Sequence, residues 1–552
     1  MLKQLFRKKP VLQALENEPE QAESHSLNKV LTTRDLTFFG IAAIIGAGSF
    51  SSMGEACFKG GPGVVFLFII CAVACGFTAL CYAEFASRVP VSGSAYTYAY
   101  VSFGEVFAWV IGWALLMEYS IGNIYVAFSW SGYFTNLLEG VGLHLPEWLT
   151  TNYRSAHNMY EQNISSEGML AWMTAPQLGG LRIIFDLPAV IINLLITALV
   201  YVGVKETRNA SNFMVMLKLA VIVLVIGVGA FYVDIDNWTP FMPNGFTGVM
   251  GGVAAVFFAF IGFDAVSTLA EECKDPQRDL PKGMIYSLII CTIVYIALAL
   301  VLTGMVSYAQ LGVSDPLAEV FKIREVKWML YIVSFVAVVA MTSVLLVFQM
   351  GQPRIWMSMS RDGLMPKRFA KIHPKYKTPG FATIVTGLVV GIPLFFTDEK
   401  FVLDFTSIAT LFAFVLVCGG VLMLPPKQKG EGGKFQLPYV NAKFIFPVML
   451  VMAAGLLMTF NPDFFNNTFI INSETAATNI PMLVFFAVCV LMAVFSFLKN
   501  FSLIPVMGVV SCCYLLTGMT ISNWLWFFTW LAIGVVIYFI YGFRNSKLAI
   551  TN

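Results

Sequence analysis

The stretch GIAAIIGAGSF, residues 40 to 50, lies inside the first apolar segment of the chain that is long enough to cross a membrane. Its glycines Gly46 and Gly48 fall near the middle of that segment. Because glycine costs about 1 kcal/mol relative to alanine in a helix interior, we expect the helix to be interrupted there. The alternative interpretation is that the glycines allow a neighbouring helix to pack closely.

A second stretch, FFAFIGFDAVST at residues 257 to 268, has the same character and contains Gly262. Each stretch lies in the first helix of a predicted run of five membrane helices. Interruptions at corresponding places in two halves of a membrane protein indicate a transporter's binding site near the membrane midplane.

Composition identifies the bilayer as the solvent of this protein. Of 552 residues, 58% are apolar and 12% are charged, whereas a soluble domain has about 25% charged residues. The net charge of +2 does not indicate a nucleic-acid partner. The ten cysteines show no paired CxxC spacing, so we expect no disulfide framework, no metal site and no cofactor.

Apolar runs bounded by glycine, proline and charged residues predict an all-α polytopic fold. We predict fourteen membrane helices, at residues 35–57, 64–87, 104–139, 183–203, 210–232, 247–270, 283–308, 328–357, 379–396, 401–424, 443–460, 480–498, 502–519 and 524–542.

These helices divide the chain into five predicted parts. They are an N-terminal tail at 1–34, a first five-helix repeat at 35–232, a second at 247–424, four further helices at 443–542 and a C-terminal tail at 543–552. The tails and the loops predicted on their side hold 26 of the 34 Lys and Arg residues, and the opposite side holds seven. Cytoplasmic loops carry the excess of Lys and Arg, so both termini are predicted to be cytoplasmic, in a multi-pass protein of the cytoplasmic membrane.

An interrupted helix suits a zwitterionic ligand. Unwinding frees backbone N–H groups at the start of one half-helix and C=O groups at the end of the other. We expect the N–H groups around Ala47, Gly48 and Ser49 to bind a carboxylate. The carbonyls near Ile44 and at 259–261 would receive an ammonium group, so the pattern favours free L-amino acids.

Lys218 and Glu118 are ionisable residues deep inside predicted membrane helices. Such residues are costly in a bilayer and indicate function by default. Lys218 is a candidate for proton coupling if it points into the bundle, and a lysine that reaches the cytoplasmic surface is the alternative. Glu118 is a candidate pocket or coupling acid, whereas Asp264 is interpreted as an acid that stabilises the start of a half-helix.

Four segments match the motifs of one known family, in order, across about residues 30 to 425. The most specific is FFAFIGFDAVSTLAEECKDPQRDLPKGM at 257–284, and the others are IIGAGSF at 44–50, GVKETRNASNFMVMLKLAVI at 203–222 and RIWMSMSRDGLMPKRFAKIHPKYKTPGFAT at 354–383. With these segments the chain resembles the cationic amino acid transporter branch of the amino acid-polyamine-organocation superfamily.

The resemblance implies a LeuT-type fold of two inverted five-helix repeats with the first and sixth helices discontinuous. It implies that the substrate backbone binds at Ile44, Ala47, Gly48, Ala259 and Ile261, with Phe258 as an aromatic gate. Ser49 departs from the aliphatic residue usual after GAG and adds a hydroxyl beside the proposed carboxylate site.

Lys218 matches a lysine that replaces a sodium ion in proton-coupled members of the superfamily. Its expected partners are the carbonyl of Gly46 and the hydroxyl of Ser343. The predicted function is therefore secondary active transport of L-amino acids by alternating access, as proton symport. An amino acid exchanger and a non-transporting amino acid sensor are alternatives that would retain the same binding site.

Other classes of protein fit the sequence less well. An intramembrane hydrolase would need a nucleophile and a base, and neither HExxH nor GxSxG occurs in the sequence. The predicted external loop at 140–182 contains no cysteine, so we expect no disulfide-linked heavy subunit. The expected partners are the amino acid substrate, protons and the lipid bilayer.

Overall fold

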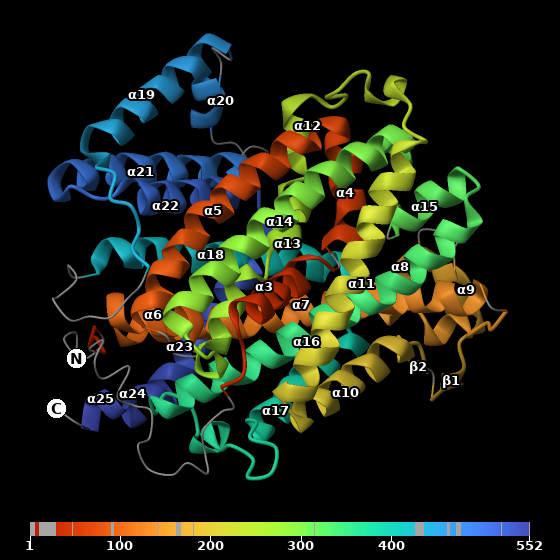
Figure 1. Ribbon diagram of the computed structural model, residues 1–552, viewed down its shortest axis with the longest axis horizontal. Helices are drawn as coiled ribbons and strands as arrows, with labels where there is room; N and C mark the ends of the chain where they lie inside the picture. The colour runs from red at the N-terminus through yellow and green to blue at the C-terminus, as the bar shows by residue number, and fades with distance from the viewer. Residues whose placement is uncertain are drawn as a thin grey trace.

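The computed structural model is a bundle of helices (Figure 1). It describes residues 6–9, 29–46, 48–89, 93–140, 142–161, 167–179, 181–313, 315–424, 435–460, 464–470, 476–519 and 521–550. Within these residues ten helices are long and apolar enough to cross a membrane, and three apolar helices of 10–17 residues accompany them. The protein is thus an integral multi-pass membrane protein.

The centre of the bundle is formed by helices that bury most of their surface. The span at Glu105–Glu139 is 89% buried and the span at Val253–Glu272 is 94% buried. Helix α7 (Glu105–Gly140) packs against α16 (Lys327–Arg361) and α18 (Glu399–Met423), while α14 (Pro276–Met305) packs against α3 (Thr33–Ile44) and α5 (Val64–Arg88). This core surrounds the two predicted interruptions.

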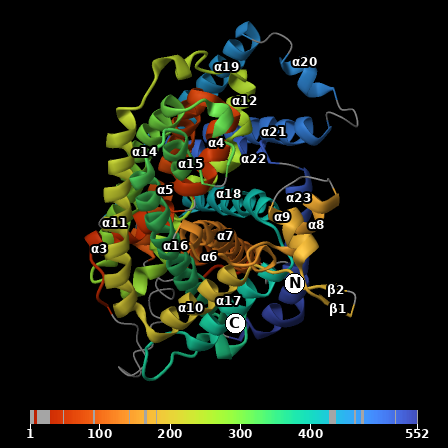
Figure 2. The same cartoon turned by 90° about the vertical axis from the view of Figure 1, so that its right-hand side faces the viewer.

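Further helices cover this core. They are α10 (Leu187–Val202), α11 (Val204–Ala230), α17 (Gly380–Gly391), α22 (Leu503–Leu516) and α23 (Ile521–Ile537). Two others, α19 (Ala442–Phe460) and α21 (Ala476–Lys499), lie at the edge of the bundle, and their spans are only 11% buried. Figures 1 and 2 show α19 and the short α20 (Phe464–Phe469) at the outside of this edge.

Most predicted helices match observed ones within a few residues, but the first and sixth are each built from pieces. The first comprises α3, a π-helical turn at Gly48–Ser52 and α4 (Met53–Gly60). The sixth comprises α12 (Gly245–Gly251), α13 (Val253–Phe260) and the 3-10 helix η5 (Phe263–Glu272). The count of fourteen spans and the inverted-repeat relation stay predictions.

Several short elements were missed by the hydropathy pattern because they are too short or too polar to span a bilayer. The predicted external loop contains α8 (Tyr153–Glu161), α9 (Glu167–Thr174) and a hairpin of β1 (Gln177–Leu178) and β2 (Leu181–Arg182). The others are α6 (Ser94–Ser102) and α15 (Pro316–Ile323), while α24 (Phe543–Asn545) and α25 (Lys547–Ile550) form the C-terminal end.

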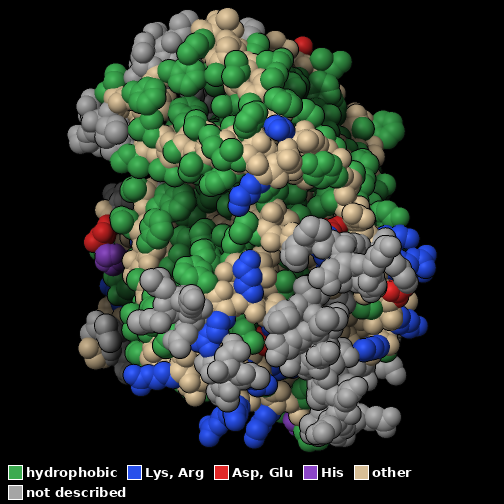
Figure 3. Space-filling view, turned by 90° about the vertical axis from the view of Figure 1, so that its left-hand side faces the viewer, with side chains coloured by type: hydrophobic (Ala, Val, Ile, Leu, Met, Phe, Trp, Pro, Cys, Tyr) green, Lys and Arg blue, Asp and Glu red, His purple; other side chains and the backbone are tan. Residues whose placement is uncertain are grey.

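The surface agrees with insertion in a bilayer. Figure 3 shows hydrophobic side chains over the upper and middle parts of one face, with Lys and Arg gathered mainly in its lower part. Large apolar side chains such as Phe213, Val223 and Ile293 are more than 60% exposed. Exposed apolar surface of this kind is stable against lipid rather than water.

Candidate functional site

The first interruption lies between α3 and the π-helical turn. Helix α3 ends at Ile44, and the next residue, Ile45, has extended backbone angles of φ −83° and ψ 101°. The chain resumes helical structure at Gly48. The proposed ligand residue Ala47 lies outside the described residues.

The second interruption lies between α13 and η5. Helix α13 ends at Phe260, Ile261 is extended with φ −61° and ψ 139°, and Gly262 has a left-handed φ of 116°. A side chain at Gly262 would be strained in this conformation, because residues with a Cβ rarely adopt it. The glycine therefore permits the change of direction between the two half-helices.

The glycines at both interruptions also bring the two broken helices together. A Cβ added at Gly48 would lie 2.6 Å from Cα of Ala259, and one added at Gly262 would lie 2.6 Å from Cβ of Ala43. Gly46 packs against Val344 of α16 in the same way. Helix interruption and close packing, posed as alternatives from the sequence, occur together here.

The carbonyl ends of the two helices converge on one hydroxyl group. Tyr295 of α14 donates to the carbonyl oxygen of Ile44 at 2.7 Å and to that of Ala259 at 2.9 Å. Tyr295 is fully buried. Two carbonyls from different broken helices thus lie within reach of a single donor, which is the arrangement that an ammonium group would also need.

The N–H groups near the first interruption are partly used within the chain. Ser49 and Phe50 both donate their backbone N–H to the carbonyl of Gly46 at 3.0 Å, and the Ser49 hydroxyl donates to the same carbonyl at 3.1 Å. The Ser49 N–H is therefore not available to a carboxylate in this conformation. The N–H of Gly48 donates to no backbone carbonyl among the described residues.

Phe258 lies beside these groups on α13. Its ring is 4.7 Å from that of Tyr125 on α7, at an interplanar angle of 77°, and its side chain is 5% exposed. The Tyr125 hydroxyl in turn lies 3.0 Å from the Ser51 hydroxyl of the π-helical turn. The aromatic pair thus connects both broken helices with α7.

Lys218 points into the bundle. Its side chain is fully buried, and its ammonium group donates to the carbonyl of Ala42 at 3.0 Å, to the carbonyl of Ile45 and to the Ser343 hydroxyl at 2.9 Å. Of the two possible partners, Ser343 is contacted, whereas the Gly46 carbonyl accepts from the backbone N–H groups of Ser49 and Phe50. One cation therefore joins α3, α11 and α16 at the interruption.

Glu118 of α7 and Asp264 of η5 form a buried acidic pair. Their exposures are 2% and 1%, and they are close enough for their charges to interact. Neither oxygen of Asp264, nor Oε2 of Glu118, has a hydrogen-bond partner among the described residues. The Tyr119 hydroxyl lies near Asp264, and the Thr410 hydroxyl lies near Glu118.

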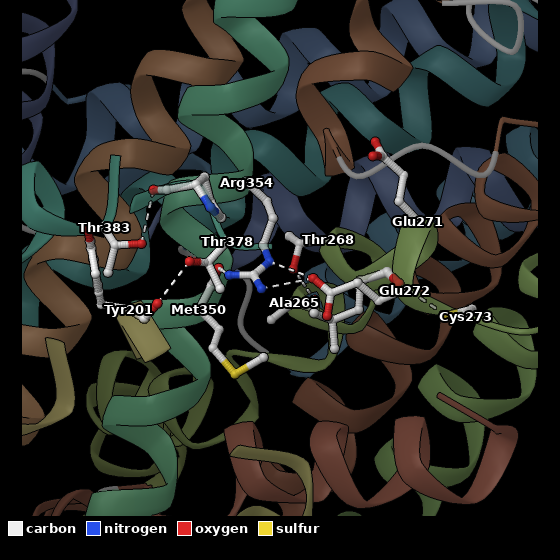
Figure 4. Close-up of polar contacts among 12 residues, drawn as sticks. Tyr201, Ala265, Thr268, Glu271, Glu272, Cys273, Met350, Arg354, Thr378 and Thr383 are labelled. Atoms are coloured by element: carbon white, nitrogen blue, oxygen red, sulfur yellow. Dashed lines mark hydrogen bonds and ion pairs between the residues drawn. The ribbon is translucent and has the colours of Figure 1, made fainter. Parts of the chain in front are cut away.

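An ion pair ties the far end of η5 to α16. Arg354 donates through Nε to Oε1 of Glu272 at 2.9 Å, and its Nη2 lies 2.8 Å from the same oxygen, with both side chains 1% exposed. Figure 4 shows the guanidinium group of Arg354 pointing at this carboxylate. Arg361, about two turns further along α16, pairs with Glu271 at 2.8 Å. These two ion pairs attach the C-terminal end of η5 to α16, at the opposite end of η5 from Asp264.

Sequence reasoning missed the role of Tyr295 and treated Asp264 only as an acid at a helix start. The available signal for Tyr295 was a tyrosine hydroxyl near the middle of the apolar run at 285–305. For Asp264 the signal was its place two residues after Gly262. Neither signal indicated which distant groups the side chain would meet.

Interrupted helices, convergent carbonyls and buried ionisable side chains in a multi-pass helical bundle define a membrane carrier. Comparison with known families makes the class specific. The sequence profile of the amino acid permease family matches residues 31–495, and that of the C-terminus of amino acid permeases matches residues 502–546. The chain belongs to the amino acid permease family, whose members are transporters.

Individual relatives cover the whole chain. A branched-chain amino acid permease and a methylthioribose transporter of Bacillus subtilis (strain 168) are each 37% identical over 545 residues, which cover 99% of both chains. A vacuolar cationic amino acid transporter 2 of Arabidopsis thaliana is 30% identical and covers 96% of this chain and 91% of its own. These similarities support amino acid transport as the function.

Proposed function

We propose that this permease carries L-amino acids across the cytoplasmic membrane by alternating access, coupled to protons, with both termini in the cytoplasm. The observation that carries the proposal is the convergence of the Ile44 and Ala259 carbonyls on Tyr295. A substrate ammonium group would donate to the two carbonyls in place of the Tyr295 hydroxyl, which would keep its proton. The substrate carboxylate would bind the N–H of Gly48 at the start of the π-helical turn.

The proposed substrate-binding residues are therefore those at the two interruptions. Ile44 and Ala259 supply carbonyls, Gly48 supplies an N–H, and Ser49 adds a hydroxyl once its bond to Gly46 opens. Ala47 and Ile261 complete the backbone site, and Phe258 closes over it with Tyr125.

Lys218 supplies the proposed coupling. As an ammonium ion it holds α3 and α16 through three acceptors, and as a neutral amine it would hold them less firmly. The protonation state of Lys218 would then bias the equilibrium between two arrangements of the broken helix. A proton taken up on one side and released on the other would drive accumulation of the substrate.

The buried acids Glu118 and Asp264 affect which substrate side chains the proposed site can accept. Two buried carboxylates that each have an oxygen without a hydrogen-bond partner among the described residues repel each other in a dry interior, so their arrangement favours a proton or a cationic group between them. The relatives are named for branched-chain amino acids, cationic amino acids and methylthioribose. We propose that Glu118 and Asp264 make a cationic side chain acceptable in the site.

Uptake of radiolabelled amino acids into proteoliposomes tests the substrate proposal. Free L-amino acids should compete with one another, and lysine should lose its competition in Glu118→Gln. The decarboxylated amine of each effective amino acid should compete at least tenfold less well, because it lacks the carboxylate that Gly48 would bind. Equal competition by amine and parent amino acid would contradict the proposed geometry.

The coupling proposal is tested with Lys218→Met and Lys218→Ala under an imposed pH gradient. We expect substrate binding to survive in part while gradient-driven accumulation is lost in both variants. Undiminished proton-driven uptake would leave Lys218 as a structural residue. Uptake that requires internal amino acid would favour an exchanger, and binding without any uptake would favour a sensor.

A further inference from the structure

A cavity of about 410 Å³ lies among the C-terminal helices, far from the proposed substrate site. Its walls come from α19, α20, α21 and α22, and all its lining residues are apolar. On α19 it extends from Phe446 to Leu457. At 1.5 Å per residue this is roughly 17 Å, about half of a ~30 Å hydrocarbon core.

Two lysines stand at one end of the same helices. Lys443 begins α19 one turn before Phe446, and Lys499 ends α21. The Lys443 ammonium lies 5.1 Å from the ring centre of Phe497 and 5.6 Å from that of Phe444, and Lys499 lies 6.0 Å from that of Phe495. Within the part of the chain that the structure describes, neither lysine forms an ion pair with an acidic residue.

The lysine end of this assembly is held in place by backbone contacts. The N–H of Ala442 donates to the carbonyl of Phe501 at 2.9 Å, and the N–H of Leu503 donates to that of Val440 at 2.7 Å. The start of α19 and the start of α22 are thus fixed side by side. The other parts of α19 diverge from α21 and α22, as Figure 1 shows, and leave the cavity between them.

We propose that this cavity holds an acyl chain of an anionic phospholipid whose headgroup binds Lys443 and Lys499. The cavity has the length of one leaflet's hydrocarbon layer, its walls are apolar, and Lys443 and Lys499 place two positive charges at one end. In the proposed topology that end faces the cytoplasm, where anionic headgroups attract basic side chains. A zwitterionic lipid fits the apolar part but not the charge.

Native mass spectrometry of the purified full-length protein tests the proposal. The protein is delipidated in detergent and then offered phosphatidylglycerol or phosphatidylcholine with the same acyl chains. We expect phosphatidylglycerol to be retained preferentially. The preference should fall by about fivefold for each of Lys443→Gln and Lys499→Gln. Lys371→Gln, an exposed lysine elsewhere, is the matched control and should leave the preference unchanged.

Filling the cavity supplies an independent test. Ala454→Phe adds a ring to the cavity wall and should abolish retention of both lipids. Val451→Phe adds the same ring on α19 outside the lining and should leave lipid retention and the preference for phosphatidylglycerol unchanged. Equal retention of the two lipids by the unchanged protein would overturn the proposal. A stable dimer cross-linked through α19 would also overturn it, because a second copy would then be the occupant.

Discussion

At the residue scale, Gly48 lies in the proposed backbone site and also makes a close helix contact with Ala259. We expect Gly48→Val to abolish uptake, because its side chain would collide with the backbone of Ala259. The measurement is uptake into proteoliposomes together with substrate binding. Gly76→Val on α5 is the control, because a Cβ there meets nothing within 4 Å. Normal affinity and uptake in Gly48→Val would remove Gly48 from the site.

Asp315 offers a second prediction at this scale, outside the membrane spans. Burial, with the nearby charge of Glu319, raises the pKa of Asp315 from 3.8 to about 6. The folded state therefore binds this proton more tightly than the unfolded state, and the stabilisation is lost as pH rises from about 4 through 6.

The change proposed for Asp315 is Asp315→Asn. Between pH 4 and pH 6.5 the unfolding free energy of the unchanged protein should fall by at most about 3 kcal/mol relative to that of the variant. Thermal unfolding in detergent across this range measures the difference. Parallel pH profiles of the two proteins would show that Asp315 titrates normally.

At the element scale, η5 is a half-helix whose position depends on side chains rather than on continuous helical hydrogen bonds. Its end is attached to α16 by the buried pair of Arg354 and Glu272. Removing one partner of a buried ion pair typically costs about 3–5 kcal/mol, because it leaves an uncompensated charge. We expect Glu272→Gln to lower the free energy of unfolding by about that amount.

A double-mutant cycle checks this prediction. Arg354→Gln with Glu272→Gln should cost clearly less than the two single changes added together. Glu319→Gln, which removes the exposed ion pair with Lys322, is the control and should cost less than about 1 kcal/mol. Additive single and double effects would show that η5 is positioned by its packing alone.

At the scale of the whole molecule, described residues near both ends of the chain contact two buried acidic residues, Asp362 and Glu105. Lys9 pairs with Asp362 at 2.7 Å, and the backbone N–H of Lys547 donates to the carbonyl of Asp362 at 3.1 Å. Glu105 accepts hydroxyl hydrogen bonds from Tyr538, Ser546 and Tyr100. The two ends thereby brace α7 and α16 at one side of the bundle.

We expect Lys9→Met to destabilise the protein by about 1.5 to 3 kcal/mol, the usual worth of a hydrogen bond to a charged group. Thermal unfolding in detergent measures the loss. Lys8→Met is the matched control beside it and should change little. Substrate affinity should be unchanged in both variants, because these contacts lie away from the interrupted helices. An unchanged unfolding temperature in Lys9→Met would show that the N-terminal contact is dispensable.

The sequence by itself determined the features that depend on local composition. Hydropathy specified an integral membrane protein, because any apolar run of sufficient length must be removed from water. The cost of glycine predicted interruptions at Gly46, Gly48 and Gly262, and the helices α3 and α13 end at Ile44 and Phe260. The family was recognisable because its motifs are contiguous in the chain.

Only the tertiary structure decided which groups meet across the bundle. Lys218 contacts Ala42, Ile45 and Ser343 rather than Gly46, since the short turn after the interruption uses the Gly46 carbonyl itself. The tertiary structure likewise brings the carbonyls of Ile44 and Ala259 to the one hydroxyl of Tyr295. These contacts join residues far apart in sequence, and the rotation and depth of each packed helix, which no local pattern specifies, set their geometry.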